Sequence, residues 1–193
     1  MNRQAGLNRG GYGLEKMENA LTILTIDFEA SCLPRHGRSF PIEVGIAGAG
    51  WVQSWLIRPH ESWTGWDWTP EAEALHGLSR DRIEREGVPA ETVMARISKA
   101  LDGHRVVADS MIDQYWLDTL AEAAGMEPPF DIDHVSMLLD EHGADERSIA
   151  AAVAFADARH PVRHRAGCDA QWLSTLLDHV AGKISRNALM LAR

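Results

Sequence analysis

LTILTIDFEASC, residues 21–32, is apolar up to Phe28 except for two threonines and Asp27. A run this short and this rich in branched side chains predicts a buried strand rather than a helix. Side chains alternate between the faces of a strand, so Asp27 and Glu29 should point the same way at its carboxyl end. Neighbouring carboxylates repel unless a cation lies between them, and oxygen ligands suit Mg²⁺ or Mn²⁺. The alternative is a solvated Asp-x-Glu pair, because so short a motif often occurs by chance.

A second apolar piece, residues 105–108, precedes Asp113. Trp116 and Leu120 then recur at helical spacing, which predicts that Asp113 lies in the first turn of a helix. An acidic side chain near a helix N-terminus is favourable for electrostatic reasons alone. Asp113 is therefore either a ligand that faces the first carboxylate pair or an ordinary helix-stabilising acid.

His164 and Asp169 introduce a third segment, in which Trp172 and Leu176 share one face of a predicted amphipathic helix. Asp169 would lie on this helix, and His164 on its leading turn or in the loop before it. A histidine can titrate near neutral pH and can accept a proton from water. The alternative is a surface histidine within a basic patch, and the aspartate five residues later weakens that alternative.

Taken in this order, the three segments resemble the motifs of the DEDDh (DnaQ-like) 3′–5′ exonucleases. The resemblance extends over about residues 21–180 and implies an RNase H-like α/β fold, a mixed sheet with helices on both faces. It also implies two divalent cations, Mg²⁺ or Mn²⁺, and a histidine base that together remove nucleotides from a 3′ end. The implied metal ligands are Asp27, Glu29, Asp113 and Asp169, with Asp27 bridging the two ions, and His164 is the implied base.

Other segments resemble parts of this superfamily that border the substrate. Residues 76–78 are similar to a His-Gly-Ile segment beside the terminal nucleotide, and the basic patch at residues 159–165 suits phosphate contact. Residues 27–32, DFEASC, are similar to the DFEATC of the exoribonuclease branch, which slightly favours RNA over DNA. The expected substrate contacts are Ala30, Ser31, His76, Gly77, Leu78, Arg163 and Arg165.

Two positions depart from the superfamily's pattern. Asp109 stands four residues before Asp113, where many relatives carry Asn, and this leaves the fine geometry of the site open. Ala30 follows Glu29 where proofreading members usually have Thr, which weighs against a polymerase-proofreading role.

Composition limits the class of protein. The length of 193 residues suits one α/β domain. The net charge of −9 argues against a binder of long duplexes, which usually carries a basic face. A metal site brings its own positive charge, and an exonuclease holds only a few nucleotides. No apolar run approaches the roughly 20 residues that span a bilayer. With only two cysteines, a reduced cytoplasmic protein is expected.

We expect residues 1–17 to be a disordered extension and residues 18–193 to be one exonuclease domain. The first three strands, over 21–28, 41–48 and 51–57, should form an antiparallel meander. Further strands are predicted at 105–108 and near 131–135. Helices are predicted at about 70–76, 90–102, 113–124, 145–157 and 168–182.

Three tryptophans, Trp63, Trp66 and Trp68, precede the segment at residues 76–78. Their rings could stack on unpaired bases, a contact worth about 1–3 kcal/mol per base. The favoured alternative is that they cover the core under a long loop or form a dimer contact, because aromatic rings bury a large area. A homodimer therefore stays open.

The leading interpretation is a metal-dependent 3′–5′ exonuclease that releases nucleoside monophosphates from single-stranded RNA or DNA. The first alternative is a DNA proofreading or repair exonuclease with the same fold. The second is a non-catalytic nucleic-acid-binding module. The presence of all four carboxylates and the histidine argues against the second alternative.

Overall fold

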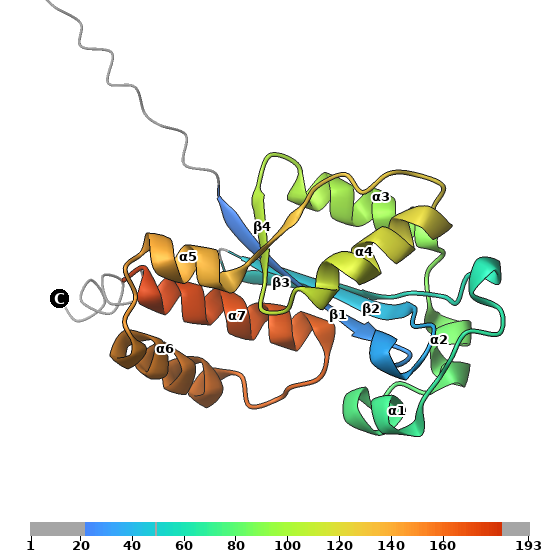
Figure 1. Cartoon of the computed structure of the whole chain (residues 1–193), viewed down its shortest axis with the longest axis horizontal. Helices are drawn as coiled ribbons and strands as arrows, with labels where there is room; N and C mark the ends of the chain where they lie inside the picture. Colours follow the sequence, from blue (N-terminus) through green and yellow to red (C-terminus); the bar gives the residue numbers. More distant parts are fainter. Residues whose placement is uncertain (1–21, 49, 183–193) are drawn as a thin grey trace, which may run out of the picture.

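The computed structural model describes residues 22–48 and 50–182 (Figure 1). They form a five-stranded mixed sheet with the strand order β3-β2-β1-β4-β5. The strands are β1 (Ile23–Ala30), β2 (Pro41–Gly48), β3 (Trp51–Leu56), β4 (Arg105–Ala108) and β5 (Ile132–His134). β1, β2 and β3 pair antiparallel, whereas β4 and β5 continue the sheet in parallel. The predicted α/β class and meander are confirmed; the extension expected at residues 1–17 lies outside the described residues.

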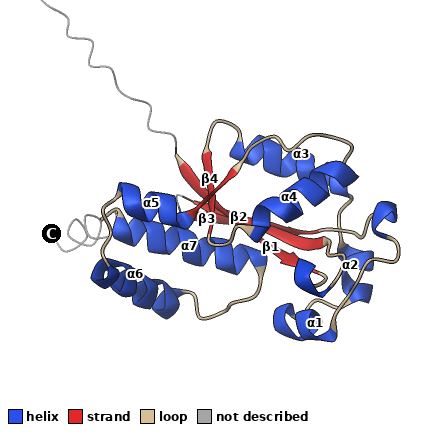
Figure 2. Cartoon of the chain, viewed as in Figure 1, coloured by secondary structure: helices blue, strands red, loops and turns tan. Residues whose placement is uncertain are grey.

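Helices cover both faces of the sheet, with α3 and α4 on one side and α5, α6 and α7 on the other (Figure 2). The helices are α1 (Pro70–His76), α2 (Arg80–Glu86), α3 (Ala90–Leu101), α4 (Ile112–Ala123), α5 (Val135–Glu141), α6 (Glu146–Arg159) and α7 (Ala166–Val180). Within the described ranges, none of them is long and apolar enough to cross a membrane.

Two short helices, α2 and α5, were not predicted from the sequence. Each has seven residues, too few turns for a hydrophobic period to be visible. Each begins at a side chain that caps it: Ser79 accepts a hydrogen bond from the backbone N–H of Arg82, and His134 accepts one from Ser136. The capping serine is the local signal that could have identified α2, whereas His134 is not a usual capping residue and gave no such signal for α5.

The two faces of β1 have different roles. Its even-numbered side chains pack into the main core with α3 and α4. Its odd-numbered side chains face α7, where the hydroxyl of Thr25 donates to the carbonyl of Ala170 at 2.7 Å. Asp27 and Glu29 are odd-numbered, so both carboxylates lie on the face that α7 covers, as strand alternation predicts.

α7 approaches the sheet closely because β2 has a glycine where the two cross. A Cβ atom on Gly45 would lie 2.2 Å from the carbonyl carbon of Ala166, far inside contact distance. The first turn of α7 therefore meets β2 through backbone atoms. This close approach brings Asp169, one turn into the helix, over β1.

α6 supports the outer side of α7. Ala152 and Ala156 are completely buried, and their small side chains let the two helices pack closely. The indole N–H of Trp172 donates to Asp157 at 2.8 Å, and the ring of His160 contacts the hydroxyl of Thr175 at 2.8 Å. These bonds tie α6 and the first residue of the connecting loop, residues 160–165, to α7; this loop carries His164.

Candidate active site

The carboxyl end of β1 has a free edge on the side of β4. The parallel pairing with β4 covers only residues 23–25 of β1. Beyond that point, the segment that joins β4 to α4 lies against the edge. The backbone N–H of Phe28, which has no strand partner there, donates to Oδ1 of Asp113 at 3.1 Å. The first turn of α4 is thereby attached to β1 beside Asp27.

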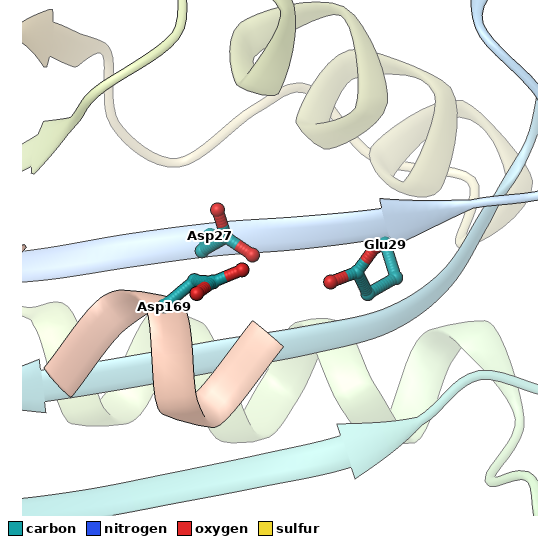
Figure 3. Close-up of side chains that lie close together, drawn as sticks. All are labelled: Asp27, Glu29 and Asp169. Carbon is teal, nitrogen blue, oxygen red and sulfur yellow. The ribbon is translucent and has the colours of Figure 1, made fainter. Parts of the chain in front are cut away.

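Five carboxylates gather at this place in two groups that share Asp27. In the first acidic group, Asp27, Glu29 and Asp169 offer oxygens that all lie within 4.8 Å of one another, and their side chains converge (Figure 3). In the second acidic group, Asp27, Asp109 and Asp113 meet the same distance limit. The structure thus brings together all four carboxylates expected from the sequence and adds Asp109 to them.

Three of these five carboxylates are largely removed from water. Asp113 is 2% exposed, and Glu29 and Asp169 are 9% exposed. Burial and the charge of Asp169 raise the pKa of Glu29 to about 8, and burial and the charge of Asp109 raise the pKa of Asp113 to about 8. Burial, followed by the charges of Asp113 and Glu29, raises the pKa of Asp27 well above its ordinary value. Carboxylates this close cannot all ionise without a cation.

The donor set fits a hard divalent cation. Oδ1 of Asp113 accepts the hydrogen bond from Phe28, whereas its buried Oδ2 has no partner in the part of the chain that the structure describes. A buried carboxylate oxygen without a partner is costly, and a cation would satisfy it. Because the candidate ligand atoms are all carboxylate oxygens, they suit a hard divalent cation of the class that includes Mg²⁺ and Mn²⁺.

Asp169 already has two protein partners. Its Oδ1 accepts from Nε of Arg163, and its Oδ2 accepts from the backbone N–H of His164 at 2.8 Å. The guanidinium of Arg163 also lies over the ring of Trp172, 4.1 Å from its centroid. Arg163, an expected phosphate contact, is therefore held against α7 and balances part of the charge of the first acidic group.

Arg165 is held by Glu43, a buried residue of β2 that was not among the predicted site residues. Nε and Nη2 of Arg165 donate to the two oxygens of Glu43 at 2.9 and 2.8 Å, and the N–H of Ala166 donates to the same carboxylate at 3.2 Å. Glu43 is 2% exposed and lies opposite Glu29 in the sheet. The sequence signal that could have identified Glu43 was its position as an acidic residue within an apolar strand. This ion pair anchors the start of α7 to β2.

His164 is exposed on the turn before α7. Its φ of 61° lies in the left-handed region, which residues with a Cβ adopt at a cost. The hydrogen bond from its backbone to Asp169 offsets that cost and ties its position to a candidate ligand. Within the described residues its imidazole makes no hydrogen bond, so the ring is free to meet a substrate.

The segment at residues 76–78 is mostly structural in this chain. His76 is 4% exposed, and its Nδ1 accepts from the N–H of Leu78 at 3.0 Å. Burial lowers the pKa of His76, which favours the neutral ring. Leu78 is fully buried, while Gly77 is exposed and ends α1 with a φ of 69°. Of the three, Gly77 is the residue whose surface a nucleotide could reach.

Ala30 and Ser31 end β1 at an irregularity in its pairing with β2. They are 7% and 0% exposed. The hydroxyl of Ser31 accepts from the N–H of Phe40, and the N–H of Ser31 donates to the carbonyl of Phe40. The hydroxyl of Ser31, an expected substrate contact, is therefore used within the protein, where it ties the end of β1 to Phe40 just before β2.

The three tryptophans have partners inside the protein. Trp63 is 3% exposed and stacks on Phe40 with 5.4 Å between ring centroids. The guanidinium of Arg38 covers the ring of Trp66 at 4.5 Å. Trp68 packs against the core and donates its indole N–H to a carboxylate of α1. These contacts favour the structural role over base stacking.

No family model matches the chain, and no curated protein matches its sequence. Solved structures do match. A full-length 3′-exonuclease matches with a TM-score of 0.62 and 14% identity, over 86% of this chain and 82% of that one. The zinc-bound complex of E. coli exonuclease I with single-stranded DNA matches with a TM-score of 0.62 and 12% identity. Exonuclease I of Methylocaldum szegediense matches with a TM-score of 0.56 and 14% identity.

The match covers less than half of each of the two exonuclease I chains. It covers 89% and 84% of this chain but only 42% and 40% of theirs. At such identities the likeness shows the fold, and activity has to be argued from the site. The chain therefore has the RNase H-like α/β fold of these solved exonucleases.

Proposed function

We propose that this protein is a divalent-metal-dependent 3′–5′ exonuclease that releases nucleoside monophosphates from single-stranded nucleic acid. The observation that carries the proposal is the convergence of Asp27, Glu29, Asp113 and Asp169 at the carboxyl end of β1. It is supported by the fold, which is that of solved 3′-exonucleases. Buried carboxylates whose pKa values are raised by one another are typical of functional sites rather than of structural ones.

Two cations, Mg²⁺ or Mn²⁺, are proposed for the site. Asp27, Glu29 and Asp169 would hold one, and Asp27 together with Asp113 would hold the other. When bound, such ions stabilise the attacking and leaving oxygens of an in-line displacement at phosphorus. The carboxylates must be ionised to act as ligands, so binding of the ions releases protons from Glu29 and Asp113.

His164 is the proposed general base. The backbone N–H of His164 donates to Asp169, and its imidazole is exposed on the turn before α7. The ring would accept the proton of the attacking water while the water oxygen bonds to phosphorus. The bond from phosphorus to the 3′ oxygen then breaks and the leaving oxygen takes a proton from solvent, which leaves a shortened strand with a 3′ hydroxyl and a released 5′-monophosphate.

The expected substrate is a short unpaired 3′ end. A terminal base has to leave its stack before the scissile phosphate can reach the carboxylates, and unpaired bases lose least in doing so. Arg163 uses Nε for Asp169, so its remaining N–H groups are proposed to contact a phosphate. The net charge of −9 argues against tight binding of a long tract.

The choice of sugar has support on both sides. Residues 27–32 are similar to the exoribonuclease branch, which favours RNA. The matching exonuclease I structures include complexes with single-stranded DNA and with a dT13 oligonucleotide, which favours a DNA exonuclease at least as well. A DNA repair-type exonuclease is therefore the second candidate function, with the same proposed chemistry.

The test is a matched set of 3′-labelled oligonucleotides incubated with the full chain and Mn²⁺. Single-stranded RNA and DNA of one sequence compare the sugars, and a blunt duplex and a 3′ overhang compare the ends. Release of labelled monophosphate, faster from the overhang than from the blunt end, is the expected result. Cleavage of a circular single strand would indicate endonuclease action and contradict the proposal. Binding without any release would support the non-catalytic module.

A further inference from the structure

Asp109 directly follows β4 and faces the second acidic group. Its carboxylate offers an oxygen within 4.8 Å of ligand oxygens of both Asp27 and Asp113. The carbonyl of Asp109 accepts from the ring of His134 at 3.1 Å, so its backbone is held to the end of β5. The side chain itself is exposed, so a cation can reach it without displacing a packed neighbour.

The second acidic group contains a buried oxygen that has no partner. Asp113 is 2% exposed, and its Oδ2 makes no hydrogen bond to any described residue. Among those residues, no Lys, Arg or His forms an ion pair with Asp27, Asp109 or Asp113. Three carboxylates with one unsatisfied oxygen and no ion-pair partner form a binding site for a small, hard, doubly charged ion.

We propose that Asp109 is a metal ligand, so that the second acidic group binds its own divalent cation through three carboxylates before nucleic acid arrives. This inference rests on the proposed function, to which it adds a residue outside the predicted ligand set. A site with three carboxylates attracts a divalent ion more strongly than one with two, because affinity follows the number of charged ligands. The five carboxylates together carry the charge that two divalent cations and the guanidinium of Arg163 would balance.

The decisive experiment measures binding of Mn²⁺ to the full chain in the absence of nucleic acid, by titration calorimetry near pH 8. Wild type is expected to bind two ions. Asp109→Asn keeps the shape of the side chain and removes its charge, and should weaken one ion about tenfold or more while leaving the other unchanged. Asp169→Asn should weaken the other ion. Asp102→Asn, an exposed acid before the opposite end of β4, is the matched control and should change neither.

A second measurement tests the charge of the Asp109 carboxylate in the absence of metal. In the presence of a chelator, Asp109→Asn should raise the melting temperature, because it removes a negative charge from a repelling cluster. Added Mn²⁺ should then stabilise the variant less than it stabilises wild type. Asp109→Ser removes the same charge with a smaller side chain and repeats both tests should Asp109→Asn fold poorly.

The outcomes separate this inference from the proposed function. Two ions bound by wild type with unchanged affinities in both Asp109 variants would overturn the role of Asp109 and leave the exonuclease proposal intact. Loss of both ions in a folded Asp109→Asn variant would also overturn it, because Asp109 would then shape the whole cluster. No binding of Mn²⁺ to wild type would remove the basis of the proposed function itself.

Discussion

The two acidic groups share Asp27 and differ in how the protein balances their charge. In the first group, Asp169 accepts a hydrogen bond from the side chain of Arg163 and another from the backbone of the same loop. In the second group, no described residue forms an ion pair with Asp109 or Asp113, and one oxygen of Asp113 has no partner. The loop before α7 brings its own positive charge to the sheet, whereas at the edge between β4 and α4 the proposed cation would supply it.

This difference has an energetic consequence. Removing the charge of Asp169 leaves the guanidinium of Arg163 without its carboxylate. Removing the charge of Asp113 leaves no cation unpaired and relieves repulsion between carboxylates. Because Asp169 also repels Glu29, removing its charge both relieves repulsion and leaves Arg163 unpaired, so it should stabilise the metal-free protein less than removing the charge of Asp113 does. Both changes should lower activity.

Asp27→Asn tests what the groups have in common and should have the largest effect. Because Asp27 belongs to both groups, the change should reduce nuclease activity by about 10⁴-fold or more and weaken both Mn²⁺ ions. Rates of 3′-label release and calorimetric titration measure the two effects. Asp102→Asn is the control. Substantial activity in Asp27→Asn would show that the shared carboxylate is not needed for catalysis.

His164→Ala tests the proposed general base, which lies on the loop before α7, next to the first acidic group. It should lower the rate of release by about 10²–10⁴-fold and leave Mn²⁺ binding unchanged, because the proposed base is not a ligand. The backbone bond from residue 164 to Asp169 is retained in the variant. His142→Ala, an exposed histidine that follows α5, is the matched control. Full activity of His164→Ala across the range from about pH 6 to 9 would assign the base elsewhere.

Two arginine variants compare the two ion pairs made by the loop before α7, Arg163 with Asp169 and Arg165 with Glu43. Arg165→Met leaves the carboxylate of Glu43 buried without its partner and should lower the free energy of unfolding by about 3 kcal/mol. Arg163→Met breaks a more exposed pair and should cost about 1 kcal/mol or less. Urea unfolding with a chelator present measures both. Equal losses would mean that Glu43 does not anchor α7.

The pH dependence of metal-free stability tests the repulsion in both groups, because Glu29 belongs to the first group and Asp113 to the second. The pKa values of Glu29 and Asp113 are raised to about 8, so the folded state holds protons that the unfolded chain has lost. The resulting stability is complete below the ordinary carboxyl pKa and is lost as the pH rises through about 8. Mn²⁺ should therefore stabilise the protein more at pH 8 than at pH 6.

Asp113→Asn should reduce this pH dependence. The amide oxygen can still accept from Phe28, while the repelling charge is gone. Above about pH 8 without metal, the variant should be more stable than wild type by about 1–2 kcal/mol. Thermal melts over a pH series with a chelator give the comparison. A variant less stable than wild type at every pH would show that the second group is not repulsive.

Much of the site follows from local patterns in the chain. Strand alternation alone places Asp27 and Glu29 on one face, and helical spacing places Asp113 and Asp169 in the first turns of their helices. These four positions, combined with the order of the motifs, predicted the gathering that the structure shows. Each of these inferences uses residues a few positions apart, where backbone geometry determines the direction of a side chain.

The tertiary structure alone decided which further residues join the site and which do not. Glu43 and Arg165 are 122 positions apart. Asp109 faces Asp27 because the pairing of β4 with β1 ends at Val107, opposite Thr25. Ser31, an expected substrate contact, and Trp63, for which two roles were considered, point inward because buried partners are available for them. Such contacts depend on strand register and helix packing, which sum many weak interactions over the whole fold, so no short stretch of sequence encodes them.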